Sequence, residues 1–155
     1  MKQGLGTQLR HLIELLDGAV EQAYVEAGLD YRPRYTPVMR ALAAQEALSV
    51  GDIAAHAGIT QPAATQTVAL MVKQGLLRVE PGKADGRQKM VRFSEAGRAL
   101  LPQLEQCWQA TAAAAASLDA QLASPLSDAL AQAIGALQEQ SFGERIRHAR
   151  NAKRD

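Results

Sequence analysis

Asp85-Gly86-Arg87-Gln88-Lys89 is the stretch that decides the fold, because it forms a charged turn between two short alternating segments. Residues 77–81 and 88–93 alternate apolar and polar side chains, which predicts two strands joined by a flexible tip at residues 82–86. A charged hairpin tip can contact the DNA backbone and minor groove when a DNA-binding helix lies beside it. The preceding segment therefore decides how the hairpin is interpreted.

Two short helices are expected before the hairpin. Ser49 is the expected N-cap of the first helix and Gly58 its C-terminal stop. Thr60 is the expected cap of the next helix, with Pro62 in the first turn, where a missing N–H is tolerated. Two helices joined by so short a turn form a helix–turn–helix, whose second helix enters the major groove in proteins that bind DNA.

The second of these helices has two distinct faces. The face expected to point inward comprises Ala64, Val68, Met71, Val72 and Gly75. The opposite face and its flanks comprise Pro62, Ala63, Thr65, Gln66, Ala69 and Lys73. Gln61, Thr65 and Gln66 can exchange hydrogen bonds with base edges. Pro62 and Ala63 can touch a thymine methyl, and Lys73 can reach a phosphate. A polar helix face with no partner is the alternative.

Amphipathic helices are expected on both sides of this region. The first has apolar side chains at helical spacing and ends near Gly28, and a linker at residues 31–35 follows it. The apolar side chains of this helix are Leu5, Leu9, Leu12, Ile13, Leu16, Val20 and Ala23. In a second helix after the linker, the side chains expected to point inward are Val38, Met39, Leu42 and Ala43.

A long helix is expected after the hairpin, with Ser94 of Phe93-Ser94-Glu95-Ala96-Gly97 as its N-cap. Its apolar side chains are Leu100, Leu101, Leu104, Cys107, Trp108, Leu118 and Leu122. Pro102 interrupts this pattern and should kink the helix or mark a late start. Ser124 and Pro125 are the expected N-cap and first residue of a last helix. The apolar stripe of that helix is Leu126, Leu130, Ile134 and Leu137.

The expected fold is mainly α with a small β-hairpin wing. A chain of 155 residues fits one domain with a core of its own. The terminal helices carry more apolar surface than one small lobe can cover, which favours burial against a second subunit. A monomeric helical bundle would show the same stripes, so the stripes alone leave both arrangements open.

Together these features resemble the MarR family of winged-helix transcription regulators over about residues 5–150. The resemblance implies a single domain, residues 1–155, with a winged helix–turn–helix DNA-binding lobe at about residues 36–97. It also implies that dimerisation helices at residues 1–30 and 98–155 interleave with those of a second subunit. Such a homodimer would bind double-stranded DNA at a pseudo-palindromic operator, most often as a repressor.

The resemblance assigns roles to the hairpin residues as well. Arg87 matches an arginine that enters the minor groove, where a weakly hydrated guanidinium meets an enhanced negative potential. Asp85 matches an acidic residue that fixes the tip by pairing with nearby basic side chains. Lys83 and Lys89 would add salt-sensitive phosphate contacts. Gln66 stands where the family often has arginine, which leaves base preference open. An ordinary charged hairpin is the alternative.

A small aromatic or phenolic effector is also implied, because such anions often bind MarR-family proteins between the dimer helices and the DNA-binding lobe. The aromatic and cationic residues nearest that junction are Tyr31, Arg32, Arg34, Tyr35 and Trp108, and of these the expected ligand-binding residues are Tyr31, Arg34, Tyr35 and Trp108. The same residues could instead pack the linker and the dimer contacts. Some family members sense oxidants through a cysteine near the first helix, but Cys107 is the only cysteine here and is expected to be buried and inert.

Charge is unevenly distributed along the chain, although the formal net charge is only +1. Residues 99–143 contain no Lys or Arg, whereas residues 73–98 contain Lys73, Arg78, Lys83, Arg87, Lys89, Arg92 and Arg98 against Glu80, Asp85 and Glu95. A basic region on a nearly neutral protein indicates contact with a polyanion. A solvated charged face is the alternative.

Several function classes find no support in the sequence. The three histidines, His11, His56 and His148, lack metal-ligand spacing, and phosphate-loop, nucleophile-elbow and paired-carboxylate motifs are missing, so neither an enzyme nor a cofactor is expected. Without a signal peptide or a membrane-spanning apolar run, a cytoplasmic location is expected. Two rival functions remain: a winged-helix module that binds protein, and a helical small-molecule-binding protein that does not bind DNA.

Overall fold

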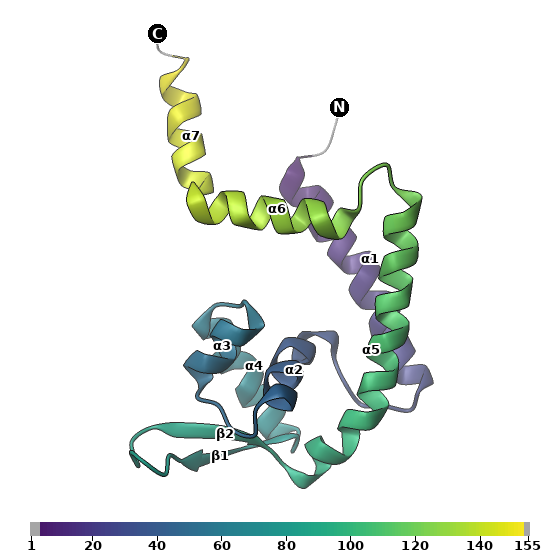
Figure 1. Cartoon of the computed structure of the whole chain (residues 1–155), viewed down its shortest axis with the longest axis vertical. Coiled ribbons are helices and arrows are strands. Elements are labelled where there is room, and N and C mark those ends of the chain that lie inside the picture. The colour runs from purple at the N-terminus through teal and green to yellow at the C-terminus, as the bar shows by residue number, and fades with distance from the viewer. Residues whose placement is uncertain (1–3, 154–155) are drawn as a thin grey trace. The chain divides into compact units, whose positions relative to one another are not determined.

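The computed structural model describes residues 4–153, and the chain forms two compact units, Met1–Trp108 and Gln109–Asp155. In the first unit, α1 (Leu5–Glu26) is followed by a 3₁₀ turn, η1 (Pro33–Tyr35), within the expected linker. The winged helix–turn–helix then comprises α2 (Thr36–Ala44), α3 (Val50–Ala57), α4 (Gln61–Lys73), β1 (Leu77–Pro81) and β2 (Lys89–Phe93), as Figure 1 shows. The mainly helical fold with a small hairpin wing is confirmed.

The two strands pair antiparallel, with Leu77 opposite Phe93 and Pro81 opposite Lys89. Leu48, in the loop before α3, adds a further bridge to β2. The Leu48 N–H donates to the Val91 carbonyl at 3.2 Å, and the Val91 N–H donates to the Leu48 carbonyl at 2.8 Å. The hairpin is therefore joined by backbone hydrogen bonds to the loop between α2 and α3.

The capping residues of the helix–turn–helix act as expected. Ser49 Oγ accepts a hydrogen bond from the Asp52 N–H at 3.1 Å, and Thr60 Oγ1 accepts one from the Ala63 N–H at 3.3 Å. Gly58 has a φ of 66°, a left-handed conformation that glycine adopts readily, and it ends α3. These contacts are local, so they set where α3 ends and α4 begins, with a short turn between the two helices.

Gly75, expected on the inward face of α4, is exposed just after the end of that helix. The core of the first unit otherwise contains the expected inward faces with two further corrections. Its most deeply buried side chains are Tyr24, Val38, Met39, Ile53, Met71, Val91 and Leu104. In α2, Ala43 is exposed and Ala41 is buried instead. In α4, Val72 is exposed and Thr67 is buried. Thr67 lies three residues after Ala64 and four before Met71, so these three residues share one face of α4. That face is the buried one, and Val72 lies outside it.

The helix after the hairpin, α5 (Glu95–Gln121), begins where Ser94 predicts. Ser94 Oγ accepts a hydrogen bond from the Gly97 N–H at 3.0 Å. The helix runs through Pro102, so the alternative of a late start is wrong. No helix among residues 4–153 is long and apolar enough to cross a membrane.

The second unit contains the end of α5, α6 (Leu126–Glu139) and α7 (Phe142–Asn151). The expected N-cap Ser124 is wrong, because Pro125 occupies the cap position of α6. The carboxylate of Asp119 instead accepts hydrogen bonds from the N–H groups of Leu126 at 2.8 Å and Ser127 at 3.3 Å. A hydrogen bond from the Ser127 hydroxyl is the main cause that lowers the pKa of Asp119 below its ordinary value.

Helix α7 is a feature that apolar periodicity did not predict. Ser141 and Glu144 form a capping box: Ser141 Oγ accepts from the Glu144 N–H at 3.3 Å, and the Glu144 carboxylate accepts from the Ser141 N–H at 2.9 Å. The Ser-x-x-Glu spacing is a sequence signal for this start.

Candidate nucleic-acid interface

The outer face of α4 presents the side chains predicted to contact DNA. Gln61, Pro62, Thr65 and Gln66 are exposed, and Ala63 is partly exposed. With Ala69, these five residues line one open hollow in the protein surface. The structure therefore gathers five of the six predicted contacts on α4 and leaves the sixth, Lys73, exposed in the last turn outside the hollow.

The hairpin tip holds the other predicted contacts in solvent, since Lys83, Asp85, Arg87 and Lys89 are all exposed. The Asp85 carboxylate accepts a hydrogen bond from the Arg87 backbone N–H at 2.9 Å, and within residues 4–153 it makes no ion pair. Gly82 permits the tight turn, because a Cβ there would lie 2.7 Å from the Asp85 carbonyl oxygen. Asp85 thus fixes the backbone at Arg87, whereas the expected pairing was with basic side chains.

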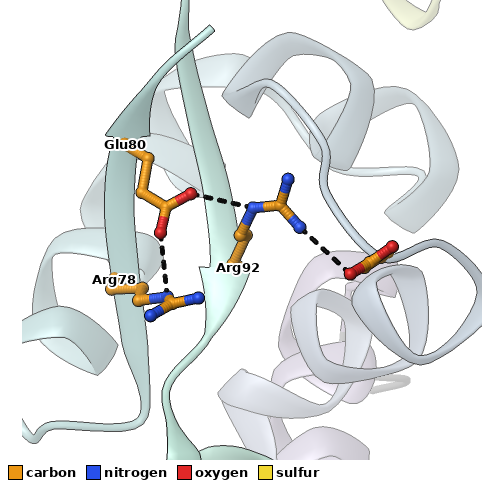
Figure 2. Close-up of polar contacts among 4 residues, drawn as sticks. Arg78, Glu80 and Arg92 are labelled. Carbon is orange, nitrogen blue, oxygen red and sulfur yellow. Dashed lines mark ion pairs between the residues drawn. The ribbon is translucent and has the colours of Figure 1, made fainter. Parts of the chain in front are cut away.

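Four charged residues, three from the hairpin and one from the loop between α2 and α3, form an ion-pair network (Figure 2). Glu80 lies between two arginines, with Oε1 3.2 Å from Arg78 Nε and Oε2 2.9 Å from Arg92 Nε. Arg92 Nη1 lies 3.4 Å from Oε1 of Glu46, in the loop between α2 and α3. Arg92 Nε is buried and has no partner in hydrogen-bond geometry, so its 2.9 Å contact with Glu80 is an ion pair with a poorly aligned N–H.

Within this network, the arginines of the basic region differ in how exposed they are. The Arg92 side chain is only 20% exposed, whereas that of Arg78 is 61% exposed. The charge count alone did not distinguish them. Strand alternation does indicate that Arg78 and Glu80 share a face. No sequence pattern connects Arg92 to Glu46, because the two residues are far apart along the chain.

The tyrosines predicted to bind an effector lie in a buried aromatic cluster. Tyr31 packs edge-on against Tyr24, with ring centroids 4.7 Å apart, and against Tyr35 at 5.6 Å. The Tyr35 hydroxyl donates to Gln74 Oε1 at 2.9 Å, and Gln74, just after α4, donates through Nε2 to the Asp30 carbonyl at 2.7 Å. Burial is the main cause that raises the pKa of Tyr31, so its hydroxyl stays neutral at ordinary pH.

The other two predicted effector residues are more accessible. Arg34 is exposed and Trp108 is partly buried. The Trp108 Nε1–H donates to the Tyr24 hydroxyl at 3.1 Å, and the guanidinium of Arg40 lies 4.9 Å from a Trp108 ring centroid. Arg40 also lines an open groove of about 450 Å³ between α2 and α3. The sequence indicated neither this groove nor the contact of Arg40 with Trp108. Among residues 4–153, no group of His, Cys, Asp and Glu side chains could hold a metal ion.

Residues 27–88 match the model of a known family, described as the MarR family. The matched span includes the whole helix–turn–helix and the hairpin tip with Asp85 and Arg87. Over these residues the chain is similar to the MarR family. None of the curated proteins matches its sequence significantly.

Solved structures of DNA-binding proteins are similar to this chain in fold. The M. tuberculosis regulator MOSR, in complex with DNA, matches with a TM-score of 0.69 at 20% identity, covering 90% of this chain and 99% of that one. A mutant of E. coli MarR complexed with operator DNA matches with a TM-score of 0.65 at 16% identity, covering 86% and 92%. Bordetella bronchiseptica BpsR, whose DNA binding is regulated by 6-hydroxynicotinic acid, matches at 25% identity with a TM-score of 0.55, covering 70% and 79%.

Proposed function

We propose that this chain is a non-enzymatic transcription regulator of the MarR family that binds double-stranded DNA in the cytoplasm. It acts as a homodimer on a pseudo-palindromic operator and represses transcription until an effector releases it. One observation carries the proposal: the polar outer face of α4 and the cationic hairpin tip are both exposed in one lobe, while the other faces of these elements form its core.

In this proposal α4 enters the major groove. Gln61, Thr65 and Gln66 meet base edges there, while Pro62 and Ala63 make apolar contacts. Arg87 enters the minor groove, where a narrow groove strengthens the negative potential. The likeness to MOSR bound to DNA and to E. coli MarR bound to operator DNA supports this docking.

Arg87→Ala and Gln66→Ala are expected to weaken DNA binding in different ways. Arg87→Ala removes a cation that reads shape and charge, so affinity should fall for most sequences and the salt slope should become shallower by about one. Gln66→Ala removes a base-reading side chain, so it should cost about 1–3 kcal/mol at preferred sites and relax base preference at one position per half-site. Fluorescence anisotropy with an operator selected from genomic DNA, measured over a range of salt concentrations, checks both expectations.

Arg147→Ala is the matched control, because it removes an equal charge from exposed α7. It should leave affinity and salt slope nearly unchanged, and circular dichroism should show all three variants folded. A folded Arg87→Ala protein that binds like wild type at every salt concentration would refute the proposed role of the hairpin. Salt-insensitive binding of wild type, or none, would favour the protein-binding winged-helix alternative.

We also propose that an aromatic carboxylate weakens DNA binding through the region around Arg34, Arg40 and Trp108. The support is the cation stacked on Trp108 and the regulation of BpsR by 6-hydroxynicotinic acid. Gln74 could transmit the effect of ligand binding to α4, because its hydrogen bonds connect the end of that helix to the Tyr35 hydroxyl and the Asp30 carbonyl. An effector acts only through different affinities for the two states, and couplings of about 1–3 kcal/mol are typical.

Aromatic carboxylates are expected to quench Trp108 fluorescence, raise the melting temperature and weaken operator binding by about 5- to 150-fold. Trp108 is the only tryptophan, so its emission reports this region alone. Arg40→Gln should remove the response while leaving operator affinity without ligand nearly unchanged. The idea fails if a broad panel changes neither fluorescence, melting nor DNA affinity. Ligand binding by a protein that binds no duplex would instead favour the helical small-molecule-binding alternative.

A further inference from the structure

The register of the hairpin sets two arginines directly opposite each other. Arg78 of β1 pairs with Arg92 of β2, and like charges in directly opposed positions of a sheet repel. Glu80 occupies the next position on the same face of β1 and gives one carboxylate oxygen to each guanidinium (Figure 2). One carboxylate therefore lies between the two like charges at this point of the hairpin.

Arg92 extends the network beyond the hairpin. Its Nη1 forms an ion pair with Glu46. Two residues after Glu46, the backbone of Leu48 pairs with that of Val91, the residue before Arg92. The backbone bridge and the ion pair together join β2 to the loop from which α3 begins. Because the Arg92 side chain is mostly buried, it is poorly placed to meet a phosphate.

We propose that Glu80 is a positioning residue for DNA binding. Through Arg92 it fixes the hairpin against the loop before α3, and through Arg78 it holds an exposed guanidinium by its Nε edge. The hairpin then presents Arg87 at a set angle to α4 without searching other orientations in the free protein. This inference rests on the proposed DNA-binding role of the hairpin and adds residues that do not themselves need to touch DNA.

The direction in which one substitution changes DNA affinity distinguishes a positioning role from a purely electrostatic one. Glu80 is an acidic group in the basic region, so long-range electrostatics alone predicts that removing it strengthens DNA binding. Positioning predicts the opposite, because Arg78 and Arg92 would then face each other without the carboxylate that lies between them, and only Arg92 would keep a partner, Glu46. A substitution that makes the hairpin more positive should therefore weaken its binding to DNA.

Glu80→Gln in the full-length protein is expected to weaken operator binding about tenfold, within the range typical of substitutions that shift an element without touching the ligand. Glu95→Gln is the matched control, since it removes an exposed carboxylate from the first turn of α5. The control should bind as tightly as wild type or slightly tighter. Thermal melting of both variants measures any general loss of stability.

Arg92→Gln provides a second, independent readout. It should also weaken operator binding about tenfold but leave the salt slope at the wild-type value, because Arg92 meets no phosphate. Glu46→Gln should weaken binding slightly in wild type and have no further effect in Arg92→Gln, as a double-mutant cycle expects for two partners in one network.

Each outcome decides between the inference and a simpler explanation. Glu80→Gln binding as tightly as wild type, or tighter, would overturn the inference, as would a shallower salt slope for Arg92→Gln. If Arg87→Ala weakens binding but Glu80→Gln does not, only the positioning role fails. If Arg87→Ala has no effect, the proposed function of the hairpin fails first.

Discussion

Gly97→Ala is expected to lower the free energy of unfolding by about 3 kcal/mol, at the upper end of what overpacking usually costs. A Cβ at this position would overlap the carbonyl oxygen of Leu76 and lie 3.0 Å from its carbonyl carbon. The backbone there cannot yield easily, because the Ser94 N–H donates to the Leu76 carbonyl at 3.0 Å and Ser94 Oγ donates to the Gly75 carbonyl at 2.5 Å. For a chain of this length the melting temperature should fall by roughly 6–12 °C.

Gly51→Ala is the matched control for that experiment. Gly51 is exposed in α3, and the nearest atom to a Cβ built there is Ser49 Oγ at 3.9 Å, an ordinary contact. The control should therefore raise the stability by about 0.5–1 kcal/mol, as alanine does where the conformation is compatible. Calorimetry at one fixed protein concentration checks both variants, because the stability of an oligomer depends on concentration. A Gly97→Ala protein that melts with wild type would show that the packing against Leu76 can relax.

Features that depend on neighbours in the sequence were the ones that the sequence predicted. Ser49 and Thr60 cap their helices through contacts three residues ahead, and Ser94 does the same for α5. The strands alternate because their two faces meet different surroundings, which a short window reveals. For this reason the sequence alone predicts the helix–turn–helix, the hairpin and the exposed face of α4.

The sequence did not predict the features that depend on contact between segments far apart along the chain. Asp119 caps α6 from the end of the preceding helix, and the serine–proline pair before α6 suggested a local cap instead. In α4 the periodicity could not separate Val72 from Thr67, since both lie at the border of the apolar face and packing decides between them. The contact of Arg92 with Glu46 has no local signature, so its positioning role could be inferred only from the folded chain.

The largest effect on function is expected from substitutions on the terminal helices. Leu5, Leu9, Ile13 and Leu16 recur at helical spacing on α1, and all are exposed in the single chain. On α6, Leu130, Ile134 and Leu137 are exposed in the same way. Contiguous apolar surface of this kind marks an interaction site in a water-soluble protein. This surface supports a homodimer, which would place its two α4 helices about one DNA turn apart, roughly 10 bp centre to centre.

Ile13→Asp and Ile134→Asp are each expected to dissociate the dimer and to abolish tight operator binding. Ile13 is 55% exposed and Ile134 is 59% exposed, so the fold of an isolated chain should tolerate a carboxylate at either position. In a dimer each change would bury two unpaired carboxylates, at a cost of about 3 kcal/mol or more, or roughly 100-fold or more in the dissociation constant. Deleting residues 1–16 should have the same effect. Sedimentation velocity and operator titrations on the same samples provide the measurement.

Val25→Asp is the control for α1, because Val25 is 61% exposed and lies on roughly the opposite side of the helix by its periodicity. It should sediment as a dimer and bind the operator like wild type. Circular dichroism must show that the Asp variants keep their helices, so that loss of the dimer is separated from unfolding. A folded Ile13→Asp or Ile134→Asp protein that remains dimeric would exclude that stripe from the interface. A variant that sediments as a monomer yet binds one operator tightly would show that each lobe reads DNA alone, and the requirement for a two-fold site would then be wrong.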